Sequence, residues 1–439
     1  SFKSALLQVH APTSLNDLSP TAPARSRLAF DELLANQLAL RLIRQQTKSA
    51  LTGRVIAGTG RISEQLLPLL PFTPTSAQQR VIAEITADQG SPDRMLRLLQ
   101  GDVGSGKTFV ALMAILTALE AGAQAALLAP TEILARQHYQ GLSKLLKPLG
   151  LTPVLLSGST KQKARQDILQ GLADGSCQIA IGTHALLTDE VLFADLALAV
   201  VDEQHRFGVR QRLVLGQKGK NCDVLVMTAT PIPRTLAMTA YGDLTVSRLD
   251  EKPAGRQDIE TALISQDRLA DVTARLAAAI SNGQRAYWIC PLVEETDKLD
   301  AAAAEDRHRA LTALLPDANP VLAHGRMKTE QREEAMSAFK DGRSKLLVAT
   351  TVIEVGVDVP EASIIIIEHA ERFGLAQLHQ LRGRVGRGDK QSSCILMYQP
   401  PLSDTARSRL KIMRQTNDGF VIAEEDLRLR GPGEVLGQR

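Results

Sequence analysis

Gly101-Asp-Val-Gly-Ser-Gly-Lys-Thr108 is the stretch that decides the fold class of this chain. It fits the phosphate-binding pattern G-x-x-x-x-G-K-[ST], in which glycines let backbone N–H groups turn toward a triphosphate. We expect Lys107 to contact the β- and γ-phosphates and the Thr108 hydroxyl to bind Mg²⁺. The other loop residues that we expect around the nucleotide are Gly104, Ser105 and Gly106.

The flanks of this loop support a nucleotide site. Residues 95–99 read as a short buried strand and 109–119 as a helix, and a strand, a Gly-rich turn and a helix N-terminus together bind anions. Further along, Asp202 and Glu203 directly follow the apolar run 196–201. Asp202 suits the metal shell, and Glu203 suits polarising an attacking water. The alternatives are a chance Gly-rich turn and an acidic pair that is only solvated. The order of strand, loop, helix and acidic pair along the chain favours a nucleoside triphosphatase.

Composition restricts the partners of the chain. Its 439 residues predict two or three domains, and the 44% of apolar residues can build sizeable cores. The formal net charge is only +3, so nucleic acid would have to bind to local basic patches. Aromatic residues make up 3% of the chain, which favours contacts to the nucleic-acid backbone over base stacking.

Cysteines and hydropathy indicate the compartment. The four cysteines lie dozens of residues apart without a C-x-x-C pair, which predicts neither a zinc site nor a disulfide framework. The most apolar stretch, 109–130, is interrupted by polar residues and is too broken to span a bilayer. With no signal-peptide pattern, we expect a cytoplasmic protein that does not contact a membrane.

Strand-like runs alternate with helical stretches in two sets, which predicts α/β architecture with parallel sheets flanked by helices. The expected strands of the first set are 96–99, 125–129, 154–156, 178–181, 198–201 and 224–227. Those of the second set are 285–290, 321–323, 345–349, 363–367 and 394–398. A polar break lies at 250–256, and a helix is expected over 28–46 with Phe30, Leu33, Leu34 and Leu38 on one side. The expected units are an N-terminal helical segment (1–50), a nucleotide-binding domain (51–248), a second domain (249–400) and a terminal segment of helices and a polar loop (401–439).

The second domain has no phosphate loop but contains Arg384 and Arg387 in a Gly-Arg-x-Gly-Arg pattern. Three residues apart, these arginines are expected on one helix face. A triphosphate on the first domain would need an arginine from elsewhere, and such a finger contributes about 10³–10⁵ in rate. An ordinary basic helix face is the alternative. The tandem layout favours the finger.

The order of the motifs resembles that of a superfamily-two helicase motor, and their amino-acid sequences most closely resemble the RecG family of bacterial ATP-dependent DNA helicases. The segments that carry the resemblance are LLQGDVGSGKT (98–108), GTHAL (182–186), DEQHRFGV (202–209), MTATPIPRTL (227–236), HGRM (324–327), TTVIEVGVDVP (350–360), QLRGRVGRG (380–388) and DGFVIAEEDLRLRGPGE (418–434). The resemblance covers nearly the whole chain. It implies two tandem RecA-like domains that bind ATP and Mg²⁺ in the cleft between them.

The resemblance also assigns residues around the base and the phosphates. It implies that Gln78 reads the adenine edge, whereas Thr75-Ser-Ala-Gln78 also fits a helix capping box, and both can hold. Phe72 is expected either to stack on adenine or to pack on its own domain. The remaining matches are Thr228 and Thr230, which would couple hydrolysis to DNA movement, and Gly356 and Asp358, which would face the nucleotide from the second domain. As bare sequence, Thr228 to Thr230 is a polar turn and Asp358 a turn residue before a proline.

DNA contacts are implied at positions where family motors touch the strand, with an ordinary surface or cap role as the alternative. These positions are Thr131, Arg136, Thr183, His184, His324, Arg326 and Thr350. Near the end of the chain, Arg428 and Arg430 alternate with leucines. The resemblance implies a loop here that grips duplex DNA, and the alternative is an amphipathic solvated edge.

Family members carry a large N-terminal wedge domain and a C-terminal tail that this sequence lacks, so we expect a trimmed motor. The implied function is a monomeric, nucleoid-associated motor that remodels duplex and branched DNA, by fork reversal and Holliday junction branch migration, with a single-stranded-DNA-binding protein as partner. A transcription-repair coupling translocase is the first alternative, although that family has Ala-Gly-Asn where this chain has Pro432-Gly433-Glu434. A nucleotide-gated binding module without turnover is the second.

Overall fold

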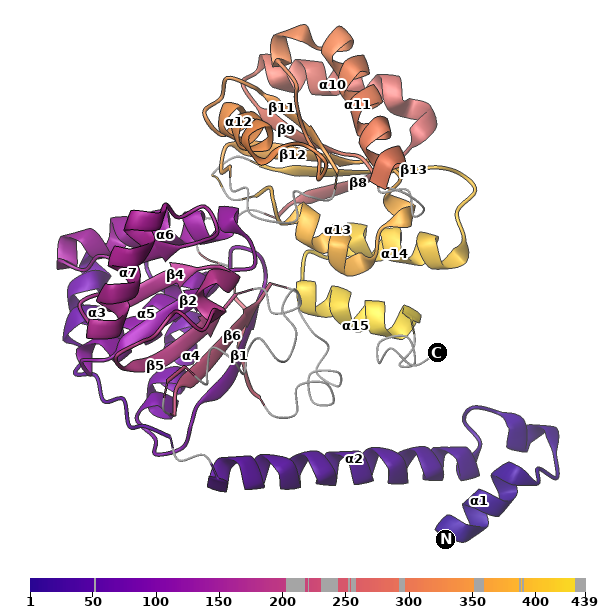
Figure 1. The fold of residues 1–439 in the computed structure, drawn as a ribbon. Helices are drawn as coiled ribbons and strands as arrows, with labels where there is room; N and C mark the ends of the chain where they lie inside the picture. The colour runs from indigo at the N-terminus through magenta and orange to yellow at the C-terminus, as the bar shows by residue number, and fades with distance from the viewer. Residues whose placement is uncertain are drawn as a thin grey trace.

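Two parallel sheets form the framework of the protein (Figure 1). The computed structural model describes the chain except residues 51–52, 203–217, 220, 230–243, 252, 254–257, 292–296, 351–358, 387, 389–390 and 431–439, and except the side chains of 40, 43–50, 297–301, 329 and 430. The first sheet has the strand order β3-β4-β2-β5-β6-β1-β7 and the second β10-β11-β9-β12-β13-β8. Their recorded pairings are parallel, which confirms the predicted fold class.

The strands of the first sheet are β1 (Leu96–Gly101), β2 (Gln124–Leu128), β3 (Val154–Leu156), β4 (Ile179–Gly182), β5 (Leu196–Val201), β6 (Asp223–Thr228) and β7 (Thr245–Leu249). Those of the second are β8 (Glu260–Ser265), β9 (Arg285–Ile289), β10 (Val321–Ala323), β11 (Leu346–Ala349), β12 (Ala362–Ile367) and β13 (Ser393–Tyr398). The central strands β5 and β12 are buried along their whole length, as expected for parallel strands covered by helices on both faces.

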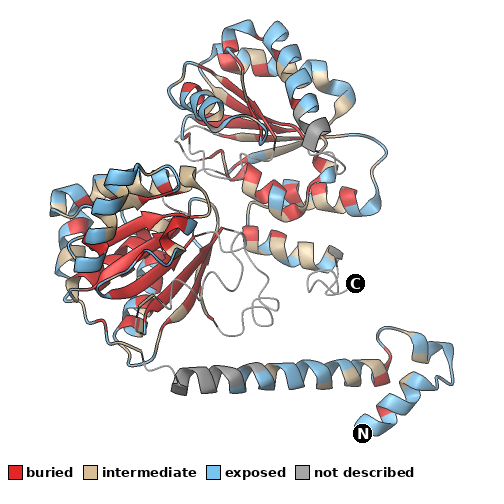
Figure 2. Cartoon of the chain, viewed as in Figure 1, coloured by how far each residue is buried: buried red, intermediate tan, exposed pale blue. Residues whose placement is uncertain are grey.

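The helices around the first sheet are α3 (Arg61–Leu66), α4 (Ser76–Gln89), α5 (Lys107–Glu120), α6 (Glu132–Leu146) and α7 (Gln162–Asp174). Those that follow are α10 (Leu269–Ser281), α11 (Asp297–Leu314), α12 (Thr329–Lys340), α13 (Leu375–Arg382), α14 (Asp404–Gln415) and α15 (Gly419–Arg430). Buried residues concentrate in both sheets and on the helix faces against them (Figure 2). Helix α5 lies almost entirely inside the first core, which brings its N-terminus to the carboxyl end of β1.

The N-terminal segment forms α1 (Phe2–His10) and the long helix α2 (Pro23–Ala50), which extends away from the two sheets (Figure 1). The expected helix over 28–46 is therefore present but longer. Its expected apolar side is exposed, with Phe30 at 60% and Leu33 at 56% exposure. Within the described part of the chain, none of the helices combines the length and apolarity needed to cross a membrane.

Three sequence expectations differ from the structure. The edge strands β7 and β8 were not expected, because their mixed polar sequences lack the apolar run of a central strand. Helix α13 ends at Arg382, so Arg384 lies in the following turn and the argument from a shared helix face is wrong. The expected DNA-gripping loop is a helix as far as Arg430, so Arg428 and Arg430 lie two apart on a helix and do not share a face.

Candidate active site

The phosphate loop lies between the end of β1 and the start of α5, as the sequence predicted. Gly104 and Gly106 have φ angles of 79° and 88°, in the left-handed region that favours glycine. A Cβ atom at Gly106 would collide with the side-chain amide of Gln78. The local backbone therefore requires glycine at position 104 by conformation and at position 106 by conformation and close approach. The loop leads into the N-terminus of α5, an arrangement that binds anions.

Lys107 is held by the loop itself. Its Nζ donates to the carbonyl oxygens of Gly101 at 2.7 Å and of Asp102 at 2.9 Å, and the residue is 9% exposed. A buried ammonium group needs such acceptors, since an unpaired charge away from water is costly. The lysine is thus oriented at the N-terminus of α5, where the helix dipole also favours a negative ligand.

A cavity of about 580 Å³ opens beside this lysine and has walls from both sheet domains. From the first domain it is lined by the predicted site residues Phe72, Gly104, Lys107, Thr108 and Asp202. From the second it is lined by Lys340, Pro360, Gln380 and Arg384. Residues from separate α/β units therefore meet around one space. Arg387 and Glu203, also predicted at this site, lie outside the described residues.

His138 was missed by sequence reasoning. It lies on α6, its Nε2 is 2.7 Å from Oδ2 of Asp202, and both side chains are nearly buried. A histidine on a carboxylate fixes the orientation of that carboxylate, as the groups behind metal ligands do. No spacing in the sequence links α6 to the end of β5, so only the tertiary structure reveals this pair.

The side chains fit Mg²⁺ bound together with a phosphate. Mg²⁺ prefers oxygen ligands and is commonly held by one or two protein groups plus substrate phosphates and water. The Thr108 hydroxyl and the Asp202 carboxylate are oxygen donors on the same cavity. Two oxygen donors on one cavity suit a metal site whose remaining ligands are phosphate oxygens and water.

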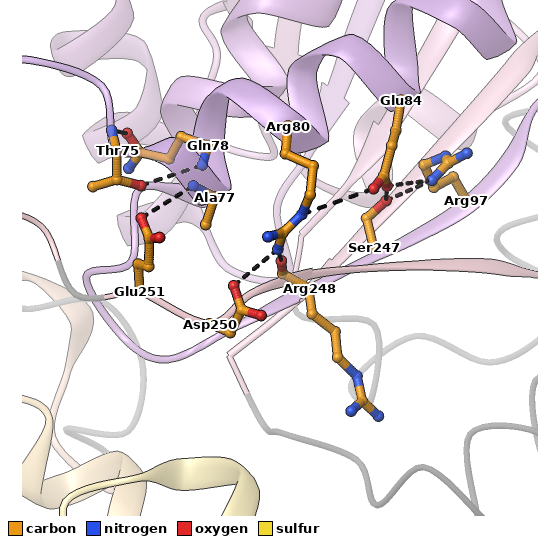
Figure 3. A network of polar contacts seen from close by, with 10 residues as sticks. All are labelled: Thr75, Ala77, Gln78, Arg80, Glu84, Arg97, Ser247, Arg248, Asp250 and Glu251. Carbon is orange, nitrogen blue, oxygen red and sulfur yellow. Dashed lines mark hydrogen bonds and ion pairs between the residues drawn. The ribbon is translucent and has the colours of Figure 1, made fainter.

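For Gln78 and Phe72, the structure shows the contacts of the structural alternative: a capping box for Gln78 (Figure 3) and packing on its own domain for Phe72. The capping box is present: Thr75 Oγ1 accepts from the Gln78 N–H, and Gln78 Oε1 accepts from the Thr75 N–H. Gln78 Nε2 also donates to the Ser105 carbonyl at 2.8 Å, which ties α4 to the phosphate loop. Phe72 packs edge-on against Phe109 with ring centroids 5.4 Å apart, yet it is 43% exposed and lines the cavity. Their contact with adenine stays a prediction.

The predicted DNA contacts follow strand ends of both sheets. Thr131 and Thr183 come after β2 and β4, and His324 and Thr350 come directly after β10 and β11. The carboxyl ends of parallel strands share one edge of a sheet, which is where ligands of such sheets bind. In the first domain this edge also carries cavity residues, the phosphate loop after β1 and Asp202 after β5, whereas the cavity residues Lys340 and Pro360 of the second domain lie near the amino ends of its strands.

The side chains of these positions differ in access. Thr183, His324 and Thr350 are buried, and His184 and Arg326 are exposed. Thr131 caps α6 by accepting from the Leu134 N–H at 3.4 Å. Two of them are paired at the surface or close to it: Arg136 with Glu132 at 2.7 Å, and His324 with Glu305 at 3.4 Å. Cap and surface roles are thus present, and a role in DNA binding stays a prediction for all seven.

The other predicted positions are only partly described. Thr228 is buried at the end of β6. Arg428 is exposed on α15 and forms an ion pair with Glu425 at 2.8 Å. Thr230, Gly356, Asp358 and the side chain of Arg430 lie outside the described residues.

The domains also touch beside the cavity. His379 Nε2 on α13 lies 3.0 Å from Asp102 Oδ1 in the phosphate loop. Gly383 approaches so closely that a Cβ there would lie 2.9 Å from Cβ of Val103. Neither contact was expected from the sequence. They place the turn that carries Arg384 directly against the phosphate loop.

Comparison with known proteins agrees with this geometry. A DEAD/DEAH box helicase model matches residues 75–239, and a helicase conserved C-terminal domain model matches 269–389. The chain is 52% identical over 448 residues to the ATP-dependent DNA helicase RecG of Pasteurella multocida, which covers 100% of this chain and 64% of that protein. It is 50% identical over 444 residues to the RecG of Escherichia coli, covering 99% of this chain and 64% of that protein.

Solved structures show the same fold. A structure of RecG bound to a three-way DNA junction is 42% identical, with a TM-score of 0.81, and covers 99% of this chain and 57% of that one. S. cerevisiae Dbp5 bound to RNA, at 19% identity and a TM-score of 0.58 over 82% of this chain and 94% of its own, supports the fold alone. The tandem RecA-like architecture is confirmed. The chain spans less than two thirds of the length of these RecG relatives, and over that span it belongs to the RecG family of helicases.

Proposed function

We propose that the chain is the motor of an ATP-dependent DNA helicase, which hydrolyses ATP with Mg²⁺ and moves along duplex DNA to remodel branched junctions. The observation that carries the proposal is the shared cavity. It combines Lys107, Thr108 and Asp202 of one RecA-like domain with Arg384 of the other. An active site built from two domains changes when they separate, so its chemistry is coupled to domain movement.

In the proposed reaction, water attacks the γ-phosphorus, the bond to the bridging oxygen of ADP breaks, and inorganic phosphate leaves. Lys107 binds the β- and γ-phosphates, and Arg384 with Arg387 neutralises charge that builds up on the transferred group. Glu203, next to Asp202 in the chain, orients the water and accepts its proton. Thr108 and Asp202 would hold Mg²⁺, which would supply positive charge against the phosphates, and His138 fixes the Asp202 carboxylate.

The proposed ligands follow from the same arrangement. Adenine would lie near Phe72 and Gln78, with Gly356 and Asp358 facing the nucleotide from the second domain. The strand-end residues and Arg428 with Arg430 would contact DNA phosphates, which position a strand without reading its sequence. The names of the relatives support DNA as the substrate, and the RecG structure bound to a three-way DNA junction supports branched DNA. We propose that the motor acts on such DNA by fork reversal and Holliday junction branch migration. We further propose a monomer in the bacterial cytoplasm, associated with the nucleoid and with a single-stranded-DNA-binding protein.

The test is a steady-state ATPase assay on the purified chain, with forked, duplex and single-stranded DNA in parallel. We expect Lys107→Ala to abolish turnover, because the phosphates lose their ammonium partner. Glu203→Gln should bind ATP and fail to hydrolyse it. Lys163→Ala, at an exposed lysine on α7, is the matched control and should behave as wild type. Normal turnover by Lys107→Ala would refute the proposal, as would equal rates with and without every DNA.

A further inference from the structure

A cluster of polar side chains joins the start of α6 to the end of β3, at the carboxyl edge of the first sheet. Ser157 and Ser159 follow β3, and Glu132 and Arg136 lie one turn apart on α6, which packs against β3 and β4 (Figure 1). Oε1 of Glu132 accepts hydrogen bonds from Arg136 Nη2 at 2.7 Å, from Ser157 Oγ at 3.1 Å and from Ser159 Oγ. Arg136 Nη2 also donates to Ser159 Oγ at 2.9 Å. Three side chains from two elements therefore donate to a single carboxylate oxygen, and we call these four residues the Glu132 cluster.

The carboxylate of this cluster is an anion held by donors that also suit phosphate. Burial raises the pKa of Glu132, but hydrogen bonds from the other three residues of the cluster and the charge of Arg136 outweigh burial and hold the pKa below its usual value. Glu132 is therefore ionised at neutral pH. Arginine and hydroxyl groups are also the donors that proteins direct at the phosphate oxygens of nucleic acids. The Glu132 carboxylate therefore occupies groups that have the composition of a phosphate site.

Thr183 provides a separate sign of a ligand beside this cluster. It is the residue after β4, and Ser157 is the residue after β3, in the register that pairs Leu156 of β3 with Gly182 of β4. The two residues therefore lie at neighbouring strand ends. Thr183 is 4% exposed, and its Oγ1 makes no hydrogen bond within the described part of the chain. A buried hydroxyl group without a partner costs free energy, so an acceptor supplied by a ligand would stabilise it.

Gly158 lies between the two serines of the cluster and is exposed. Its φ angle lies outside the left-handed region, and an added Cβ would meet no heavy atom of the described residues within 4 Å beyond its chain neighbours. Neither the backbone conformation nor packing within the protein therefore requires glycine at this position. A third use of glycine, close approach of a ligand to the backbone, fits its exposed place between the serines.

We propose that Glu132 is an internal competitor of DNA: in the free protein it occupies donors that bind a backbone phosphate once the phosphate displaces the carboxylate. The phosphate would take the three donors of the Glu132 cluster and the Thr183 hydroxyl. Carboxylate and phosphate exclude each other there, because like charges on the same donors repel. The inference rests on the proposed function in one respect, that a DNA strand follows this edge of the sheet. A motor has to release each phosphate as well as bind it, and a carboxylate that returns to the donors lowers the cost of release.

Binding of a fluorescently labelled DNA fork to the complete chain tests this competition. Anisotropy is measured without nucleotide at about 0.1 M salt, where charges more than about 10 Å apart are largely screened. Glu132→Gln keeps the shape of the side chain and removes its charge, so we expect the Kd for DNA to fall about tenfold. That factor corresponds to about 1.4 kcal/mol, the difference between a hydrogen bond to a charged acceptor and one to a neutral acceptor. Damage to the local fold would weaken DNA binding, so it does not account for a tighter complex.

Two controls separate competition for the donors from a general loss of negative charge. Glu64→Gln, the same change at an exposed glutamate of α3, should alter the Kd by less than about twofold. In the Arg136→Gln background, where one donor is already gone, the gain from Glu132→Gln should shrink to about threefold or less. An undiminished gain in that background would be a general effect of charge and would overturn the proposal.

If Glu132→Gln is unfolded, as judged by urea denaturation, Gly158→Ala decides. Its methyl group has room in the free protein but would lie where the phosphate approaches, so the Kd for DNA should rise about fivefold or more without loss of stability. An unchanged Kd in this variant overturns the proposal. Wild type that binds DNA, together with folded Glu132→Gln that binds no tighter, overturns the inference alone. Absence of DNA binding to wild type overturns the proposed function with it.

Discussion

Replacing Gln78 with alanine separates the structural role of this residue from its proposed role in reading adenine. The side chain is 2% exposed and makes two hydrogen bonds, to the Thr75 N–H and to the Ser105 carbonyl. Losing the capping box costs about 1 kcal/mol. Leaving the Ser105 carbonyl without its donor costs about 1–3 kcal/mol, and loss of a buried methylene about 0.8 kcal/mol. We therefore expect the free energy of unfolding of the first domain to fall by about 3–5 kcal/mol.

The assay is urea unfolding of Gln78→Ala beside Gln79→Ala. Gln79 is the next residue on α4, has the same side chain and is exposed, so its replacement should cost less than about 0.5 kcal/mol. Equal losses in the two variants would refute the structural argument. The adenine role is measured separately, as the ratio of ATP to GTP affinity. If Gln78 reads the adenine edge, that ratio should fall about tenfold, which corresponds to about 1.4 kcal/mol, and an unchanged ratio leaves only the cap.

Three further predictions follow from the described contacts. Arg384→Ala should lower kcat for ATP hydrolysis by about 10³ or more with little change in nucleotide affinity. Arg414→Ala, at an exposed arginine of α14, is the control and should leave kcat unchanged. Comparable kcat values for the two variants would contradict the role of Arg384 as an arginine finger. Burial raises the pKa of Asp223 to about 7, against the opposing Met95 N–H and Arg94. The protonated carboxyl therefore stabilises the fold fully below about pH 4. Up to about 4 kcal/mol of this contribution to the free energy of unfolding is lost as the pH rises from about 4 to about 7. Asp223→Asn should flatten this pH dependence of urea unfolding, and an unaltered profile would assign it to other groups. Arg428→Gln should reduce the slope of log affinity for duplex DNA against log salt by about 0.9, and an unaffected slope would remove Arg428 from the interface.

Local chemistry made the fold class and the phosphate loop predictable. The strands at 154–156 and 321–323 were predicted to the residue, because each is a short apolar run between turns, although both lie at sheet edges and are only partly buried. The edge strands β7 and β8 escaped, since they contain polar residues and owe their pairing to β1 and β13. Helices were expected in the terminal segment, but Arg428 and Arg430 were assigned to its loop, whereas they lie on α15, which packs against α13.

The composition of the candidate site was only partly predictable. Lys107, Thr108 and Asp202 follow from motifs, and the structure brings them to one cavity with Arg384. His138 beside Asp202 carries no sequence signal, because a lone histidine on an amphipathic helix is indistinguishable from a surface residue until β5 is placed next to it. Arg384 was predicted at the site for a wrong local reason, and it is the approach of the turn after α13 that puts it there.

The sequence by itself determined the elements: where glycine must occur, which runs are buried, and which residue types can bind phosphate and Mg²⁺. Such features depend on neighbours along the chain and on periodicity. Only the tertiary structure decided which distant groups meet, as in the bond between Asp102 and His379, 277 positions apart. Contacts of this kind arise from the packing of two domains, and no local pattern of residues encodes the distance between them.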